Sequence, residues 1–75
     1  MDVKNLALDL LASGGYDDPT NEERAAAGVV VANALYRMNA YVAANPNARA
    51  EAQAALGSAA ALLKFVDEHT GGESQ

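Results

Sequence analysis

The sequence predicts an all-α fold in which a short N-terminal helix precedes a long antiparallel helical hairpin, three helices in all. Apolar residues recur at three- and four-residue spacing in three segments, about 2–13, 21–44 and 46–69, which is the period of an amphipathic helix. Turn-forming residues separate the segments, and 18 of the 75 residues are alanine, the strongest helix former. We expect one small domain over residues 1–70 and a flexible C-terminal tail over residues 71–75.

The first helix is expected from Asp2 to Ser13. Asp2 is a residue type that caps helix N-termini. Gly14 and Gly15 follow the last apolar position, and glycine readily adopts the left-handed backbone that ends helices. The connection up to Pro19 is typical of a turn.

The second helix has the most specific start signal in the chain. Thr20, Asn21, Glu22 and Glu23 match a capping box, in which the Thr20 and Glu23 side chains each accept a hydrogen bond from the other's amide. The helix should run to Ala44, a length of about 36 Å at 1.5 Å per residue. Its core stripe is expected to contain Ala27, Val30, Val31, Ala34, Leu35, Met38, Tyr41 and Val42.

The third helix is expected to be continuous from Pro46 to residue 69. Asn45 and Pro46 end the second helix, because the residue before proline avoids the helical region, and Asn45 is expected to cap the third helix. A turn this tight makes two long helices antiparallel. Gly57 would then lie near Leu35, where its missing side chain permits close approach.

The second helix is unusually poor in charge, since Arg37 is the one charged residue between Arg24 and Arg49. A helix that is apolar nearly all round is normally buried all round. Either the first helix folds over the uncharged back of the second, or that back is a self-association or partner surface, which we favour. The interface is expected to contain Val29, Ala32, Tyr36, Ala40 and, from the third helix, Phe65.

Oligomerisation is also expected from size and composition. An alanine-rich chain of 75 residues buries little apolar area, and small proteins without disulfides or metals commonly gain stability by associating. A homodimer or higher homo-oligomer would complete the fold.

A membrane-spanning alternative applies to residues 25–44, which are long enough to cross a bilayer. It would place Arg37, Asn33 and Asn39 near the membrane centre, where polar groups are costly. We therefore expect no membrane contact.

Charge is segregated along the chain. Residues 1–24 carry a net charge of −4 and residues 67–75 carry −3, whereas residues 25–66 carry +2. An antiparallel hairpin would bring both acidic segments to one end, forming either a surface for a basic partner or divalent cation, or a solvated cap. This acidic end is expected to contain Asp17, Asp18, Glu22, Glu23, Asp67 and Glu68.

Arg37 needs an acceptor on a helix that is otherwise uncharged. With Asn33 and Tyr41 it could form a small pocket for an anionic ligand. Alternatively, its side chain reaches water or pairs with Glu51 across the hairpin turn.

Composition excludes several functions. The net charge of −5 argues against direct nucleic-acid binding, which requires a basic surface. Without cysteine and with a single histidine, the chain lacks disulfides and the usual zinc ligands. Neither a nucleophile motif nor a phosphate-binding loop is present, and we expect no enzyme, cofactor or metal site. The N-terminus lacks signal-peptide features, which favours a cytoplasmic protein.

These observations predict a small non-enzymatic interaction or assembly module that associates through the uncharged back of its second helix. The alternative is a small acidic inhibitor, which would block a basic host-protein surface or sequester a small anionic ligand. The signals used here are generic and identify no known family.

Overall fold

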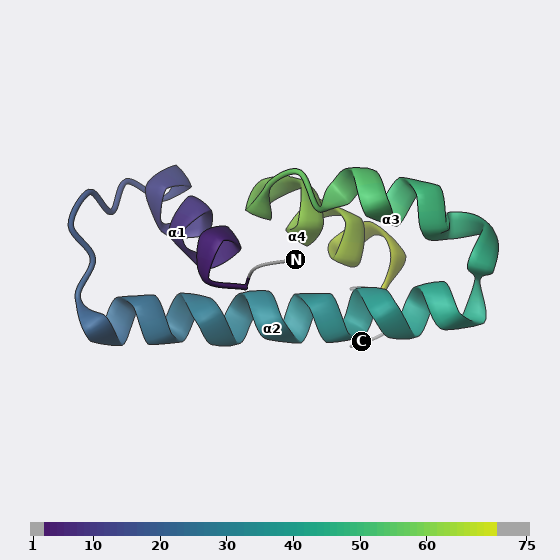
Figure 1. The fold of residues 1–75 in the computed structure, drawn as a ribbon, viewed down its shortest axis with the longest axis horizontal. Helices are drawn as coiled ribbons and strands as arrows, with labels where there is room; N and C mark the ends of the chain where they lie inside the picture. Colours follow the sequence, from purple (N-terminus) through teal and green to yellow (C-terminus); the bar gives the residue numbers. More distant parts are fainter. Residues whose placement is uncertain (1–2, 71–75) are drawn as a thin grey trace.

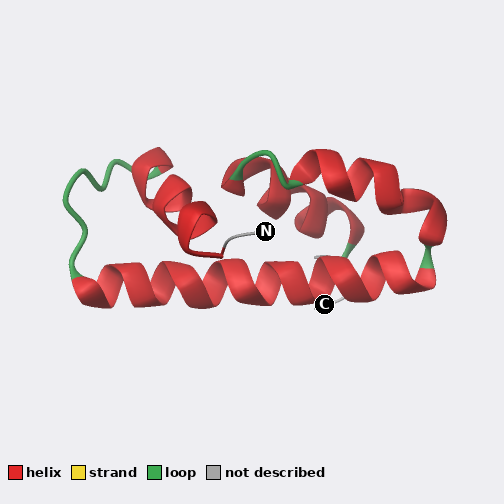
Figure 2. Ribbon diagram, viewed as in Figure 1, coloured by secondary structure: helices red, strands yellow, loops and turns green. Residues whose placement is uncertain are grey.

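The computed structural model describes residues 3–70, which are helical apart from short connections (Figures 1 and 2). The all-α prediction is confirmed, and the bounds predicted for the second helix are those of α2. The cap predicted at Asp2 and the tail predicted over residues 71–75 lie outside the described residues. The elements are α1 (Val3–Ser13), α2 (Asn21–Ala44), the 3-10 turn η1 (Pro46–Ala48), α3 (Arg49–Ala55) and α4 (Ala59–His69).

Hydrogen bonds from side chains fix both ends of α2. The capping box is present: the Glu23 amide donates to Thr20 Oγ1 at 3.1 Å, and the Thr20 amide donates to Glu23 Oε1 at 2.8 Å. At the other end, Asn45 Nδ2 donates to the Tyr41 carbonyl at 3.0 Å. The prediction that Asn45 caps the following helix is wrong, because its side chain caps the end of α2 and makes no cap hydrogen bond to η1.

The predicted end of α1 is confirmed. Gly15 has a φ of 88°, the left-handed conformation that favours glycine. The Tyr16 amide then donates to the Leu11 carbonyl at 2.9 Å, which supplies a donor to the last turn of the helix.

The prediction of one continuous third helix is wrong. The chain leaves the helical conformation at Leu56–Ser58, and Ser58 is extended, with φ −158° and ψ 160°. Ser58 Oγ accepts a hydrogen bond from the Ala61 amide at 3.1 Å, which caps the start of α4. A helix-ending glycine followed by a capping serine therefore divides the expected helix into α3 and α4.

Gly57 does not mediate close packing against α2. A Cβ placed on Gly57 would meet the Ala54 carbonyl oxygen at 3.4 Å and no atom of α2 within 4 Å. The expected approach of Gly57 to Leu35 is therefore wrong, and this glycine serves the turn between α3 and α4.

The other helices all lie on one side of α2 (Figure 1). α2 runs along the long dimension of the molecule, which measures 38 Å. α1 packs against its first half, whereas α3 and α4 lie over its second half. α3 runs back along α2, and α4 reverses direction again. The predicted hairpin of two long helices is therefore replaced by one long helix and three short ones.

The core lies between the inner side of α2 and the three short helices. Most of the stripe predicted for α2 is confirmed as buried, but Val30 is 46% exposed. Tyr41 and Val42 are half-buried at the edge of the core. The buried apolar cluster contains Leu6, Ala7, Leu11, Ala27, Val31, Ala34, Leu35, Met38, Ala52, Ala55, Leu62, Phe65 and Val66.

One long-range hydrogen bond joins α1 to α4. Asp9 Oδ2 accepts a hydrogen bond from the Ala59 amide at 2.8 Å, across 50 residues of sequence. The first amides of a helix have no partner within the helix, and a carboxylate there is also favoured by the helix dipole. Asp9 therefore fixes the position of α1 relative to the start of α4.

We expect Asp9→Ala to lower the free energy of unfolding by about 1 kcal/mol, the usual cost of removing a helix cap. Urea denaturation followed by circular dichroism measures this difference. Asp17→Ala is the matched control, because Asp17 is an exposed aspartate in the α1–α2 connection. Equal stability of the two variants would contradict a capping role for Asp9.

Candidate functional site

The side of α2 that faces away from the other helices presents a continuous apolar strip. Its two large side chains are Val29, which is 69% exposed, and Tyr36, which is 73% exposed. The remaining positions are alanines, so only these two side chains project far from the helix. We call this strip the outer face, and it contains Ala25, Val29, Ala32, Tyr36, Ala40 and Ala43, all of them exposed.

The first helix does not cover the outer face. α1 directs Leu6, Ala7 and Leu11 into the core on the inner side of α2, and Figure 1 shows it on the same side of α2 as α3 and α4. The alternative in which the first helix folds over the uncharged back is therefore wrong. Within residues 3–70, the helices that could have covered Val29 and Tyr36 all pack elsewhere.

Both arginines of α2 form hydrogen bonds within the chain. Arg24 Nη1 donates to the Pro19 carbonyl at 3.1 Å, and Nη2 bonds the Asn21 side chain. Arg37 Nη2 donates to the Thr70 carbonyl at 3.1 Å, where a cation also suits the C-terminal end of α4. The six residues of the outer face are uncharged, whereas Glu22 continues the same side of α2 at its N-terminal end and Asn33 lies beside Val29.

Phe65 does not belong to this surface. It is only 4% exposed, and its ring centroid lies 5.9 Å from that of Tyr41 and 4.4 Å from that of His69. The prediction placed Phe65 by counting along a continuous helix. Because the chain reverses at Leu56–Ser58, α4 instead turns Phe65 into the core.

The residues predicted to bind an anion are only partly brought together. Arg37 and Tyr41 line an open hollow of about 320 Å³, but Asn33 does not. The pairing of Arg37 with Glu51 is not formed, because Glu51 Oε2 instead lies 3.7 Å from His69 Nε2. Sequence reasoning missed the Thr70 carbonyl, since no local pattern indicates that α4 ends beside Arg37. The hollow is lined by Tyr36, Arg37, Ala40, Tyr41, Ala44, Asn45 and Thr70.

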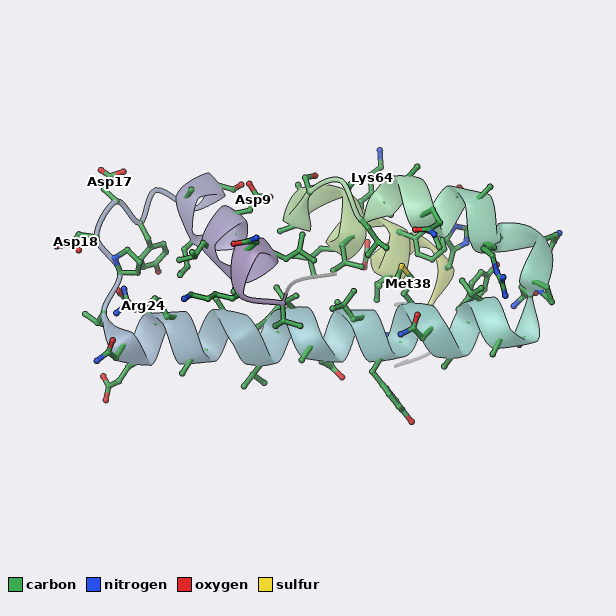
Figure 3. All side chains as sticks on the ribbon, viewed as in Figure 1. Asp9, Asp17, Asp18, Arg24, Met38 and Lys64 are labelled. Atoms are coloured by element: carbon green, nitrogen blue, oxygen red, sulfur yellow. The ribbon has the colours of Figure 1, made fainter. Side chains whose placement is uncertain are left out.

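The acidic end is not formed. Asp17 and Asp18 precede α2, at the same end of the molecule as Arg24 in Figure 3, and Glu22 and Glu23 lie in the first turn of α2. Asp67 and Glu68 end α4, which meets α2 at Arg37, about 22 Å further along at 1.5 Å per residue. Among residues 3–70, no group of three or more acidic or histidine side chains could hold a metal ion.

Comparison with protein-family models, curated proteins and solved structures finds no match for the chain. Among the described residues, no helix combines the length and hydropathy needed to cross a membrane. α2 is long enough, but polar residues such as Arg37, Asn33 and Asn39 lower its mean hydropathy. The geometry of the outer face is therefore the basis for assigning a role.

Substitution of the buried Phe65 should affect the free energy of unfolding much more than substitution of the exposed Tyr36. We expect Phe65→Ala to lower the free energy of unfolding by about 3–5 kcal/mol, as for other buried aromatic residues. Tyr36→Ala should change the stability of the monomer by no more than about 0.5 kcal/mol, because the side chain is exposed. Urea denaturation of highly diluted samples measures both values. A large loss with Tyr36→Ala in the monomer would contradict its assignment to a free surface.

Proposed function

We propose that this protein is a non-enzymatic assembly module that binds a second copy of itself through the outer face of α2. One observation carries the proposal. The two most exposed of the large hydrophobic side chains in residues 3–70, Val29 and Tyr36, lie two helical turns apart on one side of α2, among exposed alanines. Contiguous apolar surface of this kind is typical of protein–protein contacts.

Burial of the outer face would add to the limited stability that the small core of the monomer provides. The molecule is only 16 Å across its shortest dimension, so much of its apolar area lies close to water. Full burial of a valine-sized side chain contributes about 1.5–3 kcal/mol. Tyrosine is favoured at interfaces, since its ring packs while its hydroxyl stays hydrated.

A second copy suits this face better than a charged partner. The chain has a net charge of −5, so a basic partner would be attracted to the acidic side chains, which lie elsewhere. An uncharged strip allows two acidic chains to approach without placing like charges in the contact. The same patch can serve both subunits of a two-fold dimer.

A charge placed on the outer face should prevent association. We expect Val29→Glu and Tyr36→Glu each to weaken self-association at least about tenfold, because an unpaired buried charge costs several kcal/mol. Native mass spectrometry over a dilution series measures the multimer fraction, and circular dichroism checks that helix content is kept. Gln53→Glu is the control, since it adds the same charge at an exposed position of α3.

Two outcomes would contradict the proposal. One is an unmodified protein that remains a monomer at every concentration tested. The other is a multimer that persists unchanged in both glutamate variants, which would place the contact on a different surface.

The hollow at Arg37 supports a second candidate function, the sequestering of a small anion. One nitrogen of the Arg37 guanidinium donates to the Thr70 carbonyl. The remaining N–H groups are further donors in a hollow that Tyr36 and Tyr41 also line. Arginine flanked by aromatic rings suits an aromatic carboxylate better than a compact inorganic anion. Blocking of a basic host surface is not supported, because the acidic end on which it depends is not formed.

Titration with benzoate, and separately with inorganic phosphate, tests this second candidate. We expect benzoate to shift the NMR signals of Tyr36 and Tyr41 to saturation, and Arg37→Gln to abolish the shift. The fold of the variant is checked by its amide spectrum. Shifts that do not saturate, or that persist in Arg37→Gln, would remove Arg37 from any binding role.

A further inference from the structure

We infer that the two copies pair through their outer faces in the antiparallel direction, with a two-fold axis at the midpoint of α2. This inference rests on the proposed self-association and specifies how the second copy is oriented. It follows from the positions of the large and small residues on the outer face and from the distribution of charge along the molecule.

Four of the six outer-face residues pair with one another about the centre of α2. α2 extends from Asn21 to Ala44, so its midpoint lies between residues 32 and 33. In a fully overlapping antiparallel pair, residues at equal distances from this midpoint face each other. Val29 of one copy then lies opposite Tyr36 of the other, on both sides of the axis.

Two of the outer-face alanines follow the same symmetry. Ala25 and Ala40 are equally distant from the midpoint of α2 and therefore face each other. Ala32 lies beside the axis and faces Asn33 of the second copy, whereas Ala43 faces Glu22 at the end of the contact. Small side chains at these positions allow two helices to approach to about 8 Å between their axes.

The spacing of the large residues suits packing between two helices. Val29 and Tyr36 are seven residues apart, which is two helical turns and about 10.5 Å along the axis. Together with Ala25 and Ala32 they give the alternating four- and three-residue spacing of a coiled-coil seam. Each large side chain can therefore contact its counterpart, while the alanines between them keep the two helices close together.

Charge favours the antiparallel direction over the parallel one. Residues 1–24 carry a net charge of −4, and most of these acids lie around the start of α2. A parallel pair would place the two acidic segments side by side, where like charges repel. An antiparallel pair places each of them beside the second half of the other α2 instead. Residues 25–70 carry no net charge, so this arrangement lacks that repulsion, and it also opposes the two helix dipoles.

Cysteine crosslinking distinguishes the two directions, because the natural chain contains no cysteine. In the antiparallel pair, Ala32→Cys lies beside its own counterpart and should form a disulfide-linked dimer. Ala25→Cys should not link to itself, because its counterpart is about 22 Å away along the axis, beyond the ~7 Å between Cα atoms that a disulfide can bridge. Ala25→Cys should instead link to Ala40→Cys when the two variants are mixed.

The experiment uses the full chain under mild oxidation, with one variant of the mixture labelled with ¹⁵N so that mixed and self-linked dimers differ in mass. Ala12→Cys, at an exposed position of α1, gives the background rate of collisional crosslinking. We expect Ala32→Cys alone and the Ala25→Cys/Ala40→Cys mixture to crosslink well above this background. Ala25→Cys alone and Ala40→Cys alone should crosslink no faster than the Ala12→Cys background.

The outcomes separate this inference from the proposed function. Efficient self-linking of Ala25→Cys and Ala40→Cys would show a parallel pair, which overturns the antiparallel register but leaves self-association through the outer face intact. A dimer of the unmodified chain in native mass spectrometry, with none of the outer-face cysteines crosslinking above background, would overturn the register and place the contact elsewhere. An unmodified chain that stays monomeric would overturn both.

Discussion

The way in which α4 begins determines the arrangement of the whole molecule. The first amides of a helix need acceptors from outside it, and here Ser58 Oγ serves Ala61 while the Asp9 carboxylate serves Ala59. With both acceptors in place, the chain can end α3, reverse and start a new helix. The same hydrogen bond holds α1 beside α4, so that all three short helices share one side of α2. The exposed outer face is the direct result.

The parts of the fold that depend on local signals could be predicted from the sequence. The bounds of α2 follow from a capping box and an Asn-Pro pair, each contained within a few residues. The start of α4 could not be predicted in the same way, because one of its caps is Asp9, 50 residues away. Gly57 and Ser58 are a stop and a start signal, but apolar spacing continues through them and favours an uninterrupted helix. The errors at Phe65 and at the acidic end both follow from that missed reversal.

The candidate surface was more predictable than the fold around it, since it depends on one helix. Val29 and Tyr36 are exposed within this chain, whereas Val31 on the opposite side is fully buried. A helix side that is solvated usually carries charged pairs at four-residue spacing. The outer face has alanine at most of these positions instead, which is the composition of a side in contact with another helix. This contrast within α2 is the physical link between the fold and the proposed assembly.

The two sides of α2 can therefore vary independently. Residues of the inner side determine whether the chain folds, because they contact α1, α3 and α4. Val29 and Tyr36 on the outer face are largely exposed, so we expect their replacement to leave the monomer folded. If copies associate as proposed, a few exchanges at Val29, Tyr36 and the neighbouring alanines would suffice to change which copies recognise one another. New pairing specificities could thus arise by divergence after duplication, without passing through an unfolded intermediate.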